Sequence, residues 1–159
     1  MWGMVQPYRR YIAIETCISI AINVIFSALF MIAVFGRSPL IGLWGAHGLA
    51  LDFIPQTFMI SAMSVLVPTL LTRRRARRGI LEIKSRGTAR IVNHLGVRVL
   101  LIASLLTMIL SGVALAILAL SWAGPLRFWQ VFPMKLLYGG VVALIATPIG
   151  LSIALSEKQ

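Results

Sequence analysis

Residues 49–79 read LALDFIPQTFMISAMSVLVPTLLTRRRARRG. The first part, Leu49–Thr72, is an apolar run long enough to cross a bilayer, which takes about 20 residues in a helix. Directly after it come five arginines within six positions, Arg73, Arg74, Arg75, Arg77 and Arg78. This pattern predicts a transmembrane helix that ends at a charged membrane surface. Because the arginine run lies almost at the midpoint of the 159 residues, it divides the chain into two halves.

The composition places the whole chain in a membrane. Hydrophobic residues make up 59% of it and charged residues 12%, with a mean hydropathy of +0.93. Soluble domains contain roughly 45–50% apolar and about 25% charged residues. The net charge of +11 is concentrated beside apolar runs, which favours anionic lipid headgroups as its partner over nucleic acid.

Three further apolar runs have the length of a membrane span, namely Tyr11–Phe35, Val97–Trp122 and Val131–Leu155. The first of them far exceeds the roughly 7–15 residues of a signal-peptide core, so we interpret it as a helix. Short polar or glycine-containing segments join the runs within each half. We therefore predict an all-α integral membrane protein whose residues 1–159 form one membrane domain with four transmembrane helices.

The distribution of lysine and arginine predicts the orientation. Twelve of the 15 basic residues fall on one side of the predicted bundle, at Arg9, Arg10, nine positions between 73 and 98, and Lys158. The other side carries only Arg37 and Arg127, and Lys135 lies within the fourth run. Because basic loops stay in the cytoplasm, we expect a multi-pass protein of the bacterial inner membrane with both termini inside. The five clustered arginines would bind anionic lipid there.

The two halves resemble each other in sequence. Residues 11–72 and 97–155 would each form an antiparallel helical hairpin, separated by a basic cytoplasmic connector at 73–96. At an offset of 84 positions, Asn23 and Ser27 of the first half match Thr107 and Ser111 of the second. Since both hairpins leave and re-enter the cytoplasm, a duplication predicts pseudo-two-fold symmetry about the membrane normal.

Each half also resembles a small bacterial two-helix membrane domain, domain of unknown function 2798. Its pattern is a polar position in the first helix, an aromatic approach to the second, and a late proline before basic residues. Phe132–Ile149 followed by Glu157-Lys158 fits this pattern, as does Phe53–Pro68 followed by Arg73–Arg75. The resemblance implies tandem two-helix domains and no particular reaction, since the family has no assigned function.

Four charged residues lie near the ends of the predicted spans. Glu15 and Arg98 share a depth near the cytoplasmic side, and Asp52 and Lys135 share one near the outer side. We therefore predict two ion pairs between the halves, Glu15–Arg98 and Asp52–Lys135. Such pairs could fix how the two halves dock. Alternatively, each charged side chain could extend to its own membrane interface. The charges could also mark an ion or proton pathway or contact a partner subunit.

The middle of the bundle is expected to hold uncharged polar residues. A buried Asn in a membrane helix usually hydrogen-bonds a neighbouring helix. We accordingly predict helix–helix contacts at Asn23, Ser27, Thr107 and Ser111, with a ligand contact as the alternative for Asn23. Gly139-Gly140 would allow close helix approach.

The sequence contains no recognisable motif for catalysis, metal binding or a cofactor. The two histidines, His47 and His94, are expected on opposite membrane faces and so could not share a metal, although His47 alone could ligate a haem or pigment. The resulting expectation is a non-catalytic accessory or scaffolding subunit of a membrane assembly, with a membrane-protein partner or a second copy of the chain. A small transporter or channel that uses Glu15 or Asp52 is the alternative.

Overall fold

The computed structural model describes residues 5–36, 38–45, 48–77, 94–121 and 124–155. The described residues form four long helices and two very short strands: α1 (Val5–Phe35), β1 (Leu40–Ile41), α2 (Leu49–Arg77), α3 (Leu95–Ser121), β2 (Leu126–Arg127) and α4 (Phe128–Leu155). Each helix is long and apolar enough to cross a membrane. The four predicted membrane helices are therefore confirmed, and the chain is a multi-pass membrane protein.

The arginine run differs from the prediction in its secondary structure. α2 continues beyond its apolar part, Leu49–Thr72, as far as Arg77. Arginine is a good helix former, and its long stem can place the charge at the membrane surface while the backbone stays helical. The first four arginines of the run are thus the last residues of a helix rather than part of a connector. Arg78 and the rest of the connector up to residue 93 lie outside the described residues.

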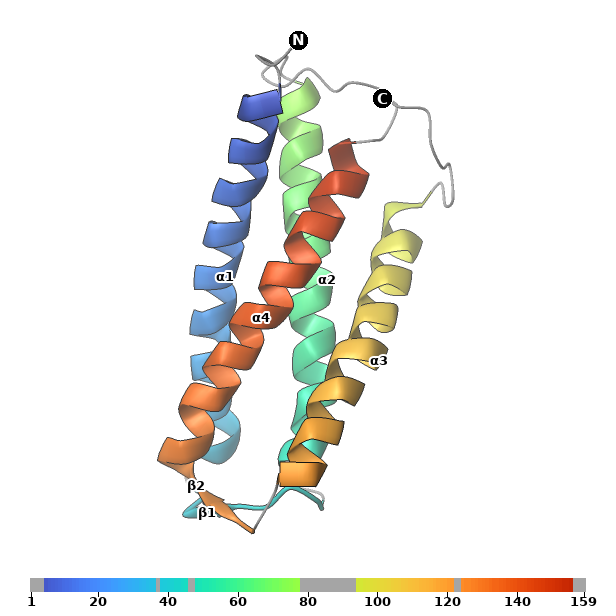
Figure 1. The fold of residues 1–159 in the computed structure, drawn as a ribbon. Coiled ribbons are helices and arrows are strands. Elements are labelled where there is room, and N and C mark those ends of the chain that lie inside the picture. The colour runs from blue at the N-terminus through green and yellow to red at the C-terminus, as the bar shows by residue number, and fades with distance from the viewer. Residues whose placement is uncertain (1–4, 37, 46–47, 78–93, 122–123, 156–159) are drawn as a thin grey trace.

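α2 and α4 are the two inner helices of the bundle. α4 packs against α1 along one side and against α2 along the other, and α2 in turn packs against α3 (Figure 1). α1 and α2 contact each other only slightly, although they are consecutive. The main packing therefore connects the first half of the chain to the second.

Small residues on α4 permit these close approaches. A Cβ atom added at Gly139 would collide with the side-chain oxygen of Ser27 on α1. One added at Gly150 would lie 2.8 Å from the Cα atom of Val65 on α2. Between them, Ala143 and Ala146 are completely buried. Membrane helices associate through such packing because lipid tails are as apolar as the helix side chains.

The two strands close one end of the bundle. β1 follows α1 and β2 precedes α4, and they pair antiparallel, with Leu40 opposite Arg127 and Ile41 opposite Leu126 (Figure 1). The loop after β1 also caps α2, because the carbonyls of Gly42 and Leu43 accept hydrogen bonds from the first N–H groups of that helix. These N–H groups have no partner within the helix itself. The loop thereby fixes where α2 begins.

The distribution of side chains is the reverse of that in a soluble protein. Large apolar side chains are exposed along all four helices, for example Phe26 at 60%, Met108 at 79% and Leu120 at 90%. Ser, Thr and Asn side chains such as Ser27, Thr57 and Thr147 are almost completely buried. Because lipid cannot hydrogen-bond a polar group, this arrangement is the one that a bilayer favours.

We predict that Gly150→Ala lowers the stability of the protein by about 1–3 kcal/mol, the usual cost of overpacking. The new methyl group would meet the backbone of α2. Gly112→Ala is the matched control, because nothing lies within 4 Å of the added atom on the exposed face of α3. Thermal unfolding in detergent measures both variants. Equal effects at the two positions would contradict close packing at Gly150.

Candidate functional site

The most unusual feature of the interior is a buried ion pair. Asp52, in the first turn of α2, and Lys135, two turns into α4, form a salt bridge. The lysine is completely inaccessible and the aspartate is 9% exposed. A charge in the membrane interior is expensive unless it is paired. The salt bridge therefore joins α2 of the first half to α4 of the second half, and each charge compensates the other in the membrane interior.

Aromatic rings surround the lysine. Its Nζ atom lies 5.4 Å from the centroid of the Phe35 ring and 5.7 Å from that of the Phe53 ring. These distances allow cation–π attraction, which adds to the ion pair. Phe35 and Phe53 belong to a buried apolar cluster that also contains Ile41 of β1. This cluster, which we call the apolar cap, includes the two rings beside Lys135 and extends to the strand end of the bundle.

Glu15 and Arg98, the other predicted pair, lie on helices that are not close neighbours. Glu15 is buried on α1, which packs mainly on α4, and Arg98 is half-buried at the start of α3, which packs on α2. Both residues lie in the half of their helix that is farther from the strands. Their pairing stays a prediction.

A network of uncharged polar side chains joins three helices near the middle of the bundle. Asn23 of α1 donates from Nδ2 to the hydroxyl of Ser64 on α2 at 3.2 Å and to the carbonyl of Ser19 at 2.8 Å. Thr147 of α4 donates to the hydroxyl of Ser19 at 2.7 Å. We call Ser19, Asn23, Ser64 and Thr147 the polar node. It places Asn23 in contact with a neighbouring helix.

Two further hydrogen bonds lie between the polar node and the ion pair. Gln56 of α2 donates from Nε2 to the hydroxyl of Ser27 on α1 at 3.0 Å. Thr57, the next residue, shares a 2.6 Å hydrogen bond with the hydroxyl of Tyr138 on α4. The Tyr138 ring packs edge-on against Phe53, with 4.5 Å between centroids. Polar contacts thus continue from the node to the aromatic side chains around Lys135.

Thr107 and Ser111 on α3 behave differently from their counterparts on α1. Both are buried, yet Thr107 donates to the carbonyl of Ala103 and Ser111 to the carbonyl of Thr107, each four residues earlier in the same helix. Their donors are therefore used within α3 rather than across a helix interface. Such bonding is common for hydroxyl residues inside membrane helices.

Of the remaining predicted residues, the structure describes the side chains of Arg74 and His94. The Arg74 side chain is exposed at the end of α2. The other arginine side chains of the run, together with His47, lie outside what the structure describes. His94, just before α3, is exposed. In the described part of the chain, no three His, Cys, Asp or Glu residues come together in a way that could hold a metal ion.

Sequence reasoning missed three of the four residues of the polar node. Ser19, Ser64 and Thr147 were not among the predicted contacts. A signal was present in α1, where Glu15, Ser19, Asn23 and Ser27 recur every four residues. That spacing places them on one helix face. In a helix whose residues are almost all apolar, the spacing of the few polar residues identifies the packed face, whereas the spacing of the apolar residues does not.

The fold and this interior define a four-helix membrane protein with a hydrogen-bonded core and a buried ion pair between α2 and α4. No protein-family model matches the chain significantly, and neither does any curated protein or solved structure. Its function therefore has to be inferred from its own residues.

We predict that Lys135→Met lowers stability by about 3–5 kcal/mol, because it leaves the buried carboxylate of Asp52 without its partner. Asp52→Leu should have a similar cost. The double variant should recover most of the loss, since a packed apolar pair can replace a buried ion pair. Denaturant unfolding of the four proteins in detergent measures the coupling. Additive losses would show that the two charges do not stabilise each other.

Proposed function

We propose that this protein is an accessory or scaffolding subunit of a membrane assembly. The main support for the proposal is that interior charged groups of the bundle bind each other. Asp52 and Lys135 bind each other beside the apolar cap, and the polar node bonds three helices together. These groups hold the bundle in one arrangement. Meanwhile α1 and α3, the two outer helices, present apolar faces that could contact lipid or another membrane helix.

The proposal includes the membrane and orientation inferred from the sequence, a bacterial inner membrane with both termini in the cytoplasm. Two observations support the orientation. The exposed Arg74 lies at the helix ends opposite to the strands, where basic residues concentrate. The exposed Trp44 and Trp129 lie at the strand end, at 68% and 77% exposure, and tryptophan favours the membrane interface.

A tandem repeat of two-helix domains, of the type called domain of unknown function 2798, is part of the same proposal. The packing order supports a repeat, although the two helices within each half hardly contact each other. If α1 is exchanged with α3 and α2 with α4, the α1–α4 contact becomes the α3–α2 contact, and the α2–α4 contact is unchanged. The same exchange, at an offset of 86 positions, maps the β1–β2 pairing onto itself. A pseudo-two-fold axis between α2 and α4 accounts for both patterns.

Replacing the five arginines at 73, 74, 75, 77 and 78 by glutamine should give a mixture of membrane orientations, because it removes much of the basic excess on the cytoplasmic side. Reporters fused to the C-terminus and read on each side of the membrane would detect this change. The control replaces Arg37 and Arg127 on the opposite side, which should leave the orientation unchanged. An unaltered orientation in the five-residue variant would contradict the assigned role of the run.

The assembly proposal predicts that the protein leaves the membrane in mild detergent as part of a larger complex. Two differently tagged copies, expressed together, distinguish the partners. Recovery of both tags indicates self-association, and recovery of one tag with another protein in fixed ratio indicates a hetero-complex. The variant Asp52→Leu/Lys135→Met should retain the complex, because its change is internal. A single 17.4 kDa chain in mild detergent would contradict the proposal.

The competing function is a small transporter or channel that uses Glu15 or Asp52. The polar side chains that run from the ion pair to the polar node favour it, since such groups could relay protons. The burial of the ion pair argues against it, because Lys135 is completely inaccessible and Asp52 is only 9% exposed. A proton or ion flux into liposomes that disappears in Glu15→Gln or Asp52→Asn would replace the scaffolding function with transport.

A further inference from the structure

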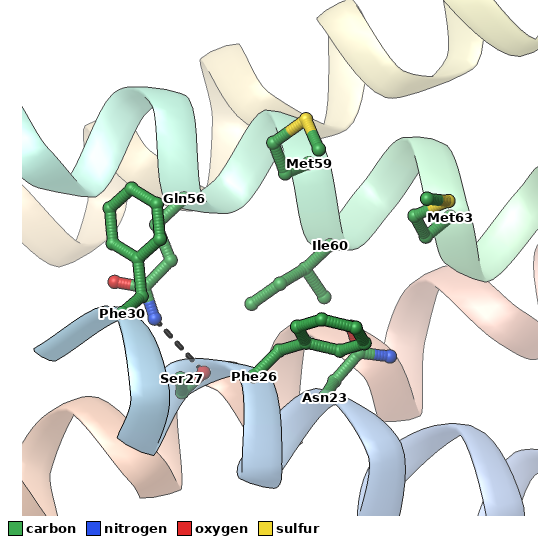
Figure 2. Close-up of a pocket in the computed structure, with 8 residues that line it drawn as sticks. All are labelled: Asn23, Phe26, Ser27, Phe30, Gln56, Met59, Ile60 and Met63. Atoms are coloured by element: carbon green, nitrogen blue, oxygen red, sulfur yellow. Dashed lines mark hydrogen bonds between the residues drawn. The ribbon is translucent and has the colours of Figure 1, made fainter. Parts of the chain in front are cut away.

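The two helices within each half of the chain hardly pack on each other. α1 and α2 contact each other only slightly, and a pocket of about 120 Å³ lies between them (Figure 2). Side-chain hydrogen bonds, such as the one from Gln56 to Ser27, bridge this separation. In the described part of the second half, α3 and α4 contact each other even less. Neither half therefore has close helix packing of its own.

Close packing and charge compensation occur between the halves. Gly139 and Gly150 of α4 allow that helix to lie against α1 and α2. Lys135 of the second half compensates Asp52 of the first. The strands β1 and β2, which also come from different halves, pair with each other. Each half thus presents a surface that the other half completes, and a half without its partner would leave a charge unpaired in the membrane.

The link between the halves is long enough to join different copies of the chain. Within the first half, the loop after β1 is bonded to the start of α2 through the carbonyls of Gly42 and Leu43, which keeps α1 and α2 together at the strand end. Residues 78–93 lie between α2 and α3. A chain of that length spans at most about 55 Å when extended. Because the axes of packed helices are only about 8–10 Å apart, this length permits the second half to pack on the first half of a neighbouring copy.

An exchange of halves between two copies would preserve the contacts that hold the bundle together. The packing of α4 on α1 and α2, the packing of α3 on α2, the ion pair and the strand pairing would all form between chains instead of within one. Such an exchange is a low-cost route to a dimer, because it needs no new surface. The order of synthesis favours it, since the first half enters the membrane before the second half of the same chain has been made.

We propose that this chain forms a dimer in which the two copies exchange halves. Asp52 of each copy binds Lys135 of the other copy, and β1 of each pairs with β2 of the other. The partner is a second copy of this chain, and its lysine completes the buried ion pair. The exchange concerns only how two copies pair, so it does not depend on the scaffolding function.

The test is disulfide cross-linking between two differently tagged copies that are produced in the same membrane. One copy carries Leu40→Cys and the other Arg127→Cys, and both carry Cys17→Ala to remove the native thiol. Leu40 and Arg127 are exposed strand partners, so both variants should fold. The Cα atoms of opposed strand residues are about 4.5–5.5 Å apart, which suits a disulfide. Exchanged halves should therefore give a covalent dimer that carries both tags.

The control pair of copies carries Leu40→Cys and Ser121→Cys. Ser121 is the exposed last residue of α3, at the strand end of the bundle, and is not a strand partner of Leu40 (Figure 1). The Leu40→Cys and Arg127→Cys pair should give about tenfold more covalent dimer than this control, because cysteines held in one interface have a higher effective concentration than cysteines that collide. Equal yields would overturn the proposal. So would a chain with both Leu40→Cys and Arg127→Cys that forms only an internal disulfide.

A second measurement uses the ion pair. Asp52→Lys and Lys135→Asp should each prevent stable folding when produced alone, because each places two like charges together in the membrane interior. In an exchanged dimer of the two variants, every pair again consists of one lysine and one aspartate, so both proteins should accumulate when produced together. Absence of this rescue, while a single chain with both substitutions accumulates, would overturn the proposal. If that chain does not accumulate, the cross-linking result decides alone.

Discussion

The arrangement depends on how closely α4 can approach its two neighbours. In a bilayer, helices gain nothing by hiding apolar surface from lipid, so contact distance and hydrogen bonding decide whether they associate. Gly139 and Gly150 allow α4 to lie directly against α1 and α2. Only at that separation can the short side chains of Ser19 and Thr147 reach each other. Close packing is therefore the condition for the polar node.

The interior that results is polar at several depths. Near the strands an ion pair joins α2 to α4, in the middle the polar node joins α1, α2 and α4, and Tyr11 of α1 bonds Thr72 of α2 towards the opposite end. Each contact specifies a particular register of one helix against another. Because apolar packing alone allows helices to slide or rotate with little penalty, these bonds select a single arrangement.

The sequence was sufficient for the number and the approximate bounds of the membrane helices. Long apolar runs and the arginines at the end of α2 are strong local signals. It was insufficient for the packing order, because the polar residues that mark the packed face of α1 do not indicate which helix packs on that face. The strands also went unpredicted, since β1 and β2 are two residues each and depend on each other. Among the site residues, Asp52 and Lys135 could be related through their equal depth, whereas Gln56 became notable only when its unbonded oxygen was located.

The pairing of β1 with β2 has a consequence for how the chain is made. It connects residues more than eighty positions apart, one strand following the first membrane span and the other preceding the last. Contacts between such distant residues form late in folding. During synthesis, the backbone of β1 cannot pair with β2, and the carboxylate of Asp52 cannot bind Lys135, until α4 has been inserted. The first half of the chain on its own would be an open, incompletely bonded intermediate, and a natural target for membrane quality control.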